Sequence, residues 1–244
     1  MLPARVHSAS TGNNKSMKTL FFGRQNCKYS IQAFEHLQNL GFDADIVLSG
    51  GRKSKLTLDI NDWVGDYIFC FRSLFVVPKI MLDNTQVSAI NFHPAPPEYP
   101  GSGCINFALY DQAKRYGVTA HEMNEKIDDG RILKCSRYPI QMEDSLDSLL
   151  IKTHRELLAL FIDITSAIKS GGLEMIDQMA MEAREEKWAG PAKKISELDK
   201  LLNISPSVSE AELMKLIRAT YTKKFPPKIV LHGYTFELKN LSRE

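Results

Sequence analysis

Residues 18–48 read KTLFFGRQNCKYSIQAFEHLQNLGFDADIVL, and this stretch decides the fold. The apolar run at its start predicts a first strand over 18–23, and the run at its end predicts a second strand over 42–48. Between them, apolar residues recur at helical spacing before a glycine stop, namely Ile31, Phe34, Leu37, Leu40 and Gly41. A strand, a helix and a second strand in succession predict one unit of a parallel α/β sheet.

The same alternation continues along the chain. Further strands are expected at residues 67–71, 87–92, 118–123 and 131–140. A helix over 105–116 is expected to end at Gly117, and a long amphipathic helix over 145–169 is expected to end at Gly171-Gly172. We therefore predict an α/β fold with a Rossmann-like, doubly wound, mostly parallel sheet. Gly23 is followed by Arg24 rather than by a second glycine in G-x-G-x-x-G, so a dinucleotide site is unsupported.

Composition indicates an ordinary soluble protein. The 244 residues suffice for one domain and an appendage, and the formal net charge of +2 gives no reason to expect nucleic acid or an anionic membrane as a partner. No apolar run approaches the roughly 20 residues of a membrane span. The four cysteines form no C-x-x-C pair, which favours neither a zinc knuckle nor a disulfide framework and fits a cytoplasmic protein.

The two ends of the chain differ in composition from its middle. Residues 1–16 are rich in Ser, Asn, Gly and Ala and predict a disordered tail, with Met17 as an alternative start. The character of the sequence changes again from Trp188, where Gly190-Pro191 precedes a short helix at 210–219. Two short strands joined by His232-Gly233 then predict a hairpin. We expect a small C-terminal α+β module over 188–244 whose exposed edge strand pairs across a homodimer.

Three polar residues stand out as a set for acyl transfer. Asn91 and His93 follow the apolar run that predicts the fourth strand, and Asp128 lies in Ile127-Asp128-Asp129-Gly130. In open α/β sheets, ligands bind at the carboxyl ends of the strands. An amide polarises a carbonyl, an imidazole moves protons, and a carboxylate orients or charges the imidazole. A metal site made of His93, His121 and Asp128 has no support from short ligand spacing, so no metal is expected.

The order of three motifs resembles the folate-dependent formyltransferases. The motifs are Asn91-Phe92-His93-Pro94 with its Pro/Gly-rich continuation to Gly101, then Gly117-Val118-Thr119-Ala120-His121, then Ile127-Asp128-Asp129-Gly130. Within that superfamily, Phe71-Arg72-Ser73 and the short C-terminal module are most similar to bacterial sugar N-formyltransferases that act on dTDP-linked amino-dideoxy sugars. The resemblance implies a catalytic domain over 17–187 and a C-terminal module for sugar-nucleotide binding, dimerisation or both.

The resemblance also implies roles for individual residues. Asn91, His93 and Asp128 become the catalytic set, and Asp129 is the variable residue of the acid-x-glycine pattern, although a shift by one position would select Asp129 instead. His121 is either a catalytic aid or a structural histidine. Residues expected to hold 10-formyltetrahydrofolate are Phe75, Val76, Val77, Asn124 and Lys126. Residues expected to hold the sugar nucleotide are Arg72, Ser73, Tyr99, Gly101, Gly103, Arg218, Tyr221 and Lys223.

The implied function is N-formylation of a dTDP-linked amino sugar, with dTDP-4-amino-4,6-dideoxyglucose as the leading candidate, for O-antigen, lipopolysaccharide or a related glycan. Two other activities use the same three residues: formylation of glycinamide ribonucleotide, and hydrolysis of formyltetrahydrofolate. A different class is a folate- or nucleotide-binding subunit without catalysis. The catalytic set predicts transfer of a formyl group in each of the three enzymatic hypotheses. It does not indicate whether the acceptor is an amino sugar, glycinamide ribonucleotide or water.

Overall fold

The computed structural model describes residues 16–51, 62–224 and 226–240. Its elements are β1 (Lys18–Arg24), α1 (Lys28–Asn39), β2 (Asp43–Ser49), β3 (Gly65–Phe71), α2 (Lys79–Asp83), β4 (Thr85–His93), α3 (Cys104–Tyr110), β5 (Arg115–Glu122), β6 (Ile132–Pro139), α4 (Leu146–Glu182), α5 (Ile195–Leu202), β7 (Asn203–Ile204), α6 (Glu210–Thr220), β8 (Lys228–Leu231) and β9 (Tyr234–Glu237). The predicted tail lies outside the described residues, apart from Ser16. Among the helices in these ranges, none is both long and apolar enough to cross a membrane.

Six strands form the central sheet in the order β2-β1-β3-β4-β5-β6. The first four of these pair in parallel, whereas β5 runs antiparallel to β4 and β6 antiparallel to β5. The predicted Rossmann-like, mostly parallel sheet is confirmed, with an antiparallel pair added at one edge. The antiparallel turn matters for function because it brings β5 back alongside the end of β4.

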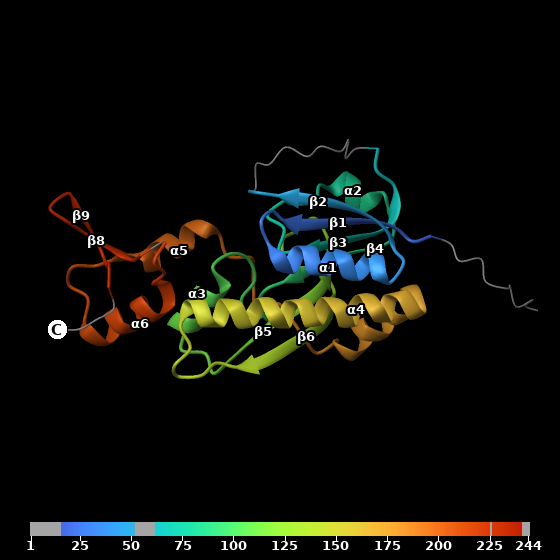
Figure 1. Cartoon of the computed structure of the whole chain (residues 1–244). Helices are drawn as coiled ribbons and strands as arrows, with labels where there is room; N and C mark the ends of the chain where they lie inside the picture. The colour runs from blue at the N-terminus through green and yellow to red at the C-terminus, as the bar shows by residue number, and fades with distance from the viewer. Residues whose placement is uncertain (1–15, 52–61, 225, 241–244) are drawn as a thin grey trace, which may run out of the picture.

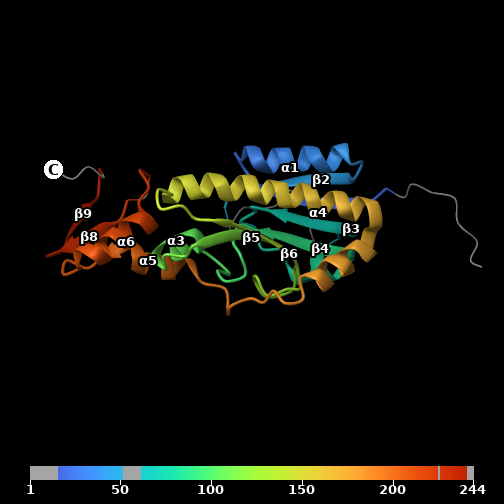
Figure 2. The same ribbon diagram turned by 90° about the horizontal axis from the view of Figure 1, so that it is seen from below.

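Helices α1 and α4 lie side by side over one face of the sheet (Figures 1 and 2). Phe161 of α4 is fully buried at the centre of this layer, with its ring 4.6 Å from that of Phe92, 5.4 Å from Phe71 and 5.7 Å from Phe21. The opposite face of the sheet carries a second apolar cluster that includes Met81 of α2. The sheet is therefore buried on both faces, which explains why its central strands are continuously apolar.

The helix predicted over 105–116 is wrong in its second half. The α3 helix ends at Tyr110, Gln112 has a φ of 55°, and the chain is already in β5 at Arg115. Gly117 therefore lies inside a strand, where a Cβ atom would be only 2.5 Å from the carbonyl oxygen of Ser136. The apolar residues of 105–116 have helical spacing, yet only those up to Tyr110 form a helix and those from Arg115 onward form a strand. The pairing of β5 with β4 and β6 outweighs the local periodicity.

The predicted glycine stop of the long helix is a kink rather than an end. Gly172 has φ 58° and ψ −135°, which lie outside the helical region, yet the chain re-enters a helix and continues to Glu182. The start is as expected, because Ser145 caps α4 through its hydroxyl and the backbone nitrogen of Ser148. The extra turns carry the chain back toward the β5–β6 loop.

The C-terminal region forms its own small layer at one end of the molecule (Figure 1). Its three-stranded sheet has the order β7-β8-β9, and the predicted hairpin is present with His232 and Gly233 both at positive φ, as a type I′ turn requires. Helix α5 and strand β7 were not predicted. The Asn106 amide donates to the carbonyl oxygen of Ala219 over 2.7 Å, which ties this layer to α3. The boundary at residue 188 remains a prediction.

Replacing Phe161 with Ala should lower the free energy of unfolding by about 3–5 kcal/mol, because the cavity would open among several packed aromatic rings. Ile162→Ala is the matched control on the same helix. Its side chain is partly exposed, so we expect a loss of about 1 kcal/mol or less. Urea unfolding followed by circular dichroism measures both values, and equal losses would contradict this view of the core.

Candidate active site

Sheet register places three of the polar side chains together. Asn91 and His93 lie two residues apart on β4, so both side chains project from the same face of the sheet. His121 on β5 is the direct cross-strand partner of Asn91, and its Nε2 atom lies 3.1 Å from Asn91 Nδ2. The antiparallel pairing of β5 therefore gives a location to a histidine whose role the sequence left open.

Asp128 reaches this group from the β5–β6 loop. Its Oδ2 atom lies 3.3 Å from His93 Nδ1 and accepts a 2.7 Å hydrogen bond from the backbone nitrogen of Gly101. Its Oδ1 atom lies 3.4 Å from both His121 Nε2 and Asn91 Nδ2. Asn91, His93 and His121 thus surround the buried Asp128 carboxylate, and the three residues predicted to be catalytic lie together.

The backbone of the loop selects Asp128 over its neighbour. Asp128 has a φ of 48°, a left-handed conformation that Asp tolerates better than most residues. Asp129 instead points outward, with its carboxylate 3.5 Å from Asn124 Nδ2 and 3.8 Å from Lys126 Nζ. Gly130 follows where a Cβ atom would lie 1.7 Å from the carbonyl oxygen of Glu122, so only glycine lets the loop fold back in this way.

His93 is surrounded by acceptors on both ring nitrogens. Its Nε2 atom lies 3.1 Å from the carbonyl oxygen of Tyr99 and its Nδ1 atom faces Asp128, so both nitrogens must carry protons to form hydrogen bonds. Burial by itself lowers the pKa of His93, but the Asp128 carboxylate and, less strongly, Cys104 raise that pKa to about 9. The imidazole is therefore an imidazolium at neutral pH.

Asp128 is the matching anion. Burial by itself raises the pKa of its carboxyl, but His93, His121 and the Gly101 amide outweigh burial and lower that pKa to about 2. Both side chains are almost completely buried, with His93 4% and Asp128 6% exposed. The centre of the site is consequently a buried ion pair at neutral pH.

Two contacts in the site were not foreseen from the sequence. The indole of Trp188 packs edge-to-face on His121, with ring centroids 4.9 Å apart, and lies 5.9 Å from the ring of His93. Cys104 Sγ lies 3.8 Å from His93 Nε2 and donates to the carbonyl oxygen of Gly101. No local signal marks either residue, because each contact depends on where the loop or helix end is placed by the rest of the fold.

The two segments expected to hold the formyl donor lie near each other beside the ion pair. Phe75 and Val77 pack in one cluster with Met123, and Lys79 Nζ lies 3.4 Å from a carboxylate oxygen of Glu125. Val76 and Ile127, one from each segment, expose their apolar side chains. An exposed apolar surface next to a buried polar cluster fits a flat heterocycle with a polar reacting group.

The residues expected to hold the sugar nucleotide fall into two groups. Near the catalytic set, Tyr99 and Gly101 contact His93 and Asp128 through their backbones, Gly103 precedes α3, and Ser73 Oγ lies 3.2 Å from Ser49 Oγ. Arg72 has a φ of 56°, and its guanidinium donates to Cys27 Sγ. A non-glycine residue held in this backbone region is a candidate for function.

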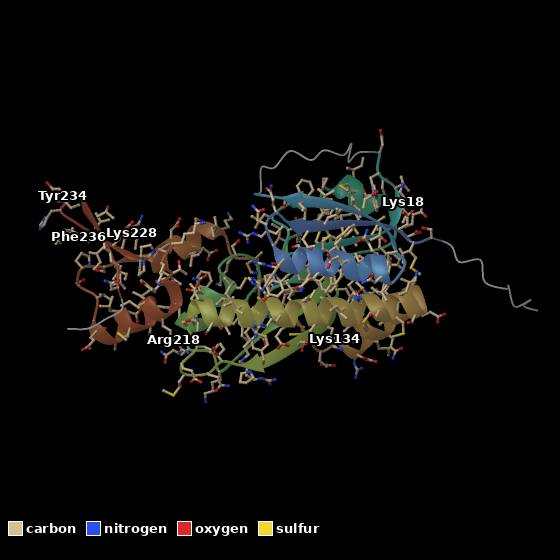
Figure 3. The ribbon with its side chains drawn as sticks, viewed as in Figure 1. Lys18, Lys134, Arg218, Lys228, Tyr234 and Phe236 are labelled. Atoms are coloured by element: carbon tan, nitrogen blue, oxygen red, sulfur yellow. The ribbon has the colours of Figure 1, made fainter. Side chains whose placement is uncertain are left out.

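The second group lies in the C-terminal layer and makes other contacts. Arg218 donates to the carbonyl oxygens of Gln141 and Asp144 at 2.9 and 3.2 Å, at the junction with the β6–α4 loop (Figure 3). The Tyr221 hydroxyl donates to the carbonyl oxygen of Lys239. Lys223 is exposed at the surface. None of the hydrogen bonds made by Arg218 or Tyr221 in the described part of the chain reaches the catalytic set.

The chain is similar in sequence and in fold to several known formyltransferases. Methionyl-tRNA formyltransferase from Pseudoalteromonas translucida is 30% identical over 145 residues, which are 59% of this chain and 43% of that relative. A 4-N formyltransferase from Francisella tularensis has the same fold, with a TM-score of 0.72 and 17% identity over 93% of this chain and 99% of that one. An N-formyltransferase from Helicobacter canadensis, solved with folinic acid and dTDP-3-aminofucose, matches 89% of this chain and 85% of that one with a TM-score of 0.62 and 16% identity.

The chain spans about half the length of the curated relatives it matches, 43% of the first and 51% of the second. The part that matches a protein family directly is residues 25–165, and the family is described as formyl transferase. This range contains the whole β4 to β6 region, with Asn91, His93, His121 and Asp128. Since the match covers more than half of its residues, the chain belongs to the formyl transferase family.

Proposed function

We propose that the protein transfers a formyl group from 10-formyltetrahydrofolate to the amine of a nucleotide-linked amino sugar. The observation that supports the choice of acceptor is the closeness of the fold. The Francisella 4-N formyltransferase matches with a TM-score of 0.72 over 93% of this chain and 99% of that one, whereas a methionyl-tRNA formyltransferase from Clostridium thermocellum that matches 93% and 94% reaches only 0.61. The dTDP-3-aminofucose of the Helicobacter protein supports dTDP as the nucleotide.

The finer proposal names a dTDP-linked amino-dideoxy sugar, with dTDP-4-amino-4,6-dideoxyglucose as the first candidate. The product would enter an O-antigen, lipopolysaccharide or related glycan. In this proposal the catalytic set binds the reacting groups, while Arg72, Ser73 and the Tyr99–Gly103 loop bind the nucleotide part.

Charge supports the position of the diphosphate. Burial first, and then the positive charges of Arg72 and Arg24, lower the pKa of His154 to about 3. Arg24 also lowers the pKa of Arg72, beyond the effect of burial. Two guanidinium groups that repel each other at the carboxyl ends of β1 and β3 would both be stabilised by a diphosphate.

Asn91 and His93 act on the developing oxyanion. The Asn91 amide and the His93 imidazolium are the proposed hydrogen-bond donors to the formyl oxygen, and His93 Nε2–H would exchange the Tyr99 carbonyl for that oxygen. One such donor contributes about 3 kcal/mol to transition-state stabilisation. The formyl donor supplies the electrophilic carbon. The rest of the rate increase comes from holding the amine beside that carbon.

Asp128 has a role set by its low pKa. A carboxylate with a pKa near 2 binds a proton weakly at neutral pH, so its first task is to keep His93 protonated and oriented. The proton that leaves the amine would pass, through Asp128 or through water, to the tetrahydrofolate nitrogen that leaves when its bond to the formyl carbon breaks. His121 donates through Nδ1 to the carbonyl oxygen of Glu122 and so presents Nε2 to Asn91 and Asp128. It is a positioning residue in this mechanism.

The protein mixed with 10-formyltetrahydrofolate and a panel of dTDP- and GDP-linked amino sugars should yield a product that has gained the mass of one formyl group. His93→Asn should lower kcat by about 10²–10³ because one donor and the charge are lost, while nucleotide affinity changes little. Mass spectrometry measures the product. His232→Asn in the hairpin turn is the control and should leave turnover unchanged.

The panel also separates the rival functions. Glycinamide ribonucleotide is included as an acceptor because its formylation is expected to use the same catalytic residues. Methionyl-tRNA is included because it is the substrate named for the Pseudoalteromonas relative. Release of formate without an acceptor would identify a formyltetrahydrofolate hydrolase. Folate or nucleotide binding without any product would favour a binding subunit, and formylation of a non-sugar acceptor alone would reject the sugar proposal.

Stability should depend on pH through the ion pair. The pKa of His93 is raised in the folded state to about 9 from about 6.5, so its contribution is complete below pH 6.5 and is lost as pH rises through 9. We expect the urea midpoint of the wild-type protein to fall more between pH 6.5 and 9.5 than that of His93→Asn. Parallel curves for the two proteins would contradict an imidazolium at position 93.

The C-terminal hairpin supports the proposed homodimer. Strand β9 is the outer strand of its sheet, and Tyr234 and Phe236 are 71% and 57% exposed on it (Figure 3). An exposed apolar edge strand pairs readily with another copy. Light scattering should give twice the monomer mass, and Phe236→Glu should give the monomer. Met142→Glu, at an exposed apolar residue of the β6–α4 loop, should stay dimeric, and a monomeric wild-type protein would remove the proposal.

A further inference from the structure

The ring of Trp188 packs against the imidazoles of His121 and His93, and it comes from a segment outside the matched family range. The segment 188–193 follows the last turn of α4 and runs past the site before α5 begins. Its indole Nε1–H donates to the carbonyl oxygen of Gly130 over 2.8 Å. The ring is therefore fixed at one end to the loop that carries Asp128, while its centroid lies 4.9 Å from that of His121 and 5.9 Å from that of His93.

Backbone hydrogen bonds hold the segment against the Pro/Gly-rich loop. Ala189 N donates to the carbonyl oxygen of Pro97, Lys193 N to that of Pro100, and Ser102 N to that of Lys193, all at 2.9–3.0 Å. The approach is so close at Gly101 that a Cβ atom there would lie 2.3 Å from Lys193 N. This is the same loop that offers Gly101 N to Asp128 and the Tyr99 carbonyl to His93. The segment thus supports both backbone partners of the ion pair.

Trp188 also borders open space. A pocket of about 390 Å³ that opens to the surface lies between the β5–β6 loop and the end of α4, and its walls include Gly130, Arg131, Ala183 and Trp188. A volume of this size holds many water molecules. The indole therefore borders both this pocket and the imidazoles of the buried site.

We propose that Trp188 is a positioning residue that keeps water away from the His93–Asp128 ion pair and fixes the planes of both imidazoles. In a dry site the carboxylate acts on the imidazolium through a low local dielectric. If the indole were removed, water from the cavity would screen that attraction, and the pKa of His93 would move from about 9 toward 6.5. Its effect on turnover rests on the proposed function, whereas its effect on the charge of His93 does not.

The titratable groups that face the pair are few. Asp128 approaches His93 from the β5–β6 loop, Cys104 from the start of α3, and His121 on β5 faces the second oxygen of Asp128. Glu186, near Trp188 in the sequence, is held by Arg137 Nη2 at 2.7 Å. A change in the titration of His93 in a Trp188 variant is therefore assigned to solvent access, provided that these neighbours are unaltered.

The chain offers a direct reporter because Trp63 and Trp188 are its only two tryptophans. In a Trp63→Phe background, emission comes from Trp188 alone, and an imidazolium nearby quenches indole fluorescence. Emission should rise with an apparent pKa near 9, and this step should disappear in Trp63→Phe/His93→Asn. Emission that does not change with pH across this range would overturn the proposal without any change at position 188.

The second measurement follows the His93 ring by NMR in histidine-labelled protein, assigned with His93→Asn. Trp188→Leu should lower the pKa of His93 by at least one unit, and Trp188→Phe, which keeps an aromatic ring but loses the N–H donor, should lie between Leu and the wild type. Trp63→Leu is the matched control, since it removes a buried indole that packs in the cluster on the other face of the sheet. An unchanged titration in a folded Trp188→Leu protein would overturn the proposal.

The activity readout then separates this inference from the proposed function. With an accepted amino sugar, Trp188→Leu should lower kcat about tenfold or more with a smaller change in KM, and the alkaline limb of the rate profile should move to lower pH. If no acceptor is formylated but the titration shifts as expected, the proposed function fails while the role of Trp188 stands. If turnover is present and neither kcat nor the titration changes, the role of Trp188 fails alone.

Discussion

The ion pair between His93 and Asp128 is the interaction on which the rest of the site depends. A buried charge is costly to desolvate unless its hydrogen-bonding capacity is met. Here the carboxylate accepts the Gly101 amide and lies within 3.4 Å of His93, His121 and Asn91, while the imidazolium has the Tyr99 carbonyl on its second nitrogen. Removing any one partner would leave a charge partly unpaired, so these segments are constrained to move together.

The topology of the sheet is what makes that convergence possible. In an all-parallel sheet, Asn91 and His93 would still lie at the carboxyl edge of the sheet. The strand after β4 would then follow a long crossover, usually a helix, and could not run straight back alongside β4. The antiparallel β5 instead sets His121 directly across from Asn91, and the loop after it is short enough to return Asp128 to the same point. The two imidazoles are therefore fixed by strand register, and the carboxylate by the loop that joins β5 to β6.

Sequence reasoning succeeded where local signals agreed with the fold. Four parallel strands, the Ser145 start of α4 and the His232-Gly233 hairpin were all visible in apolar runs, a capping residue and turn chemistry. The predicted helix over 105–116 was wrong in its second half because the residues from Arg115 onward pair in the sheet as β5. The position of Trp188 in the site was not predicted, because its hydrogen bond joins it to Gly130, 58 residues away in the sequence, and no local pattern encodes such a contact.

Local sequence signals also indicate the reaction better than they indicate the acceptor. The residues proposed to perform the chemistry lie on two strands and one tight loop, where strand alternation and the acid-x-glycine pattern leave few candidate positions. Arg218 and Tyr221, which we expect to bind the sugar nucleotide, also make contacts within the protein: Arg218 donates to the carbonyls of Gln141 and Asp144, and Tyr221 donates to that of Lys239. A donor that already binds a protein carbonyl becomes available to a ligand only if that bond breaks, which costs about as much as the new bond gains. In the proposed function, the nucleotide is therefore bound by the cations at the ends of β1 and β3, where Arg72 has a left-handed backbone conformation beside Arg24.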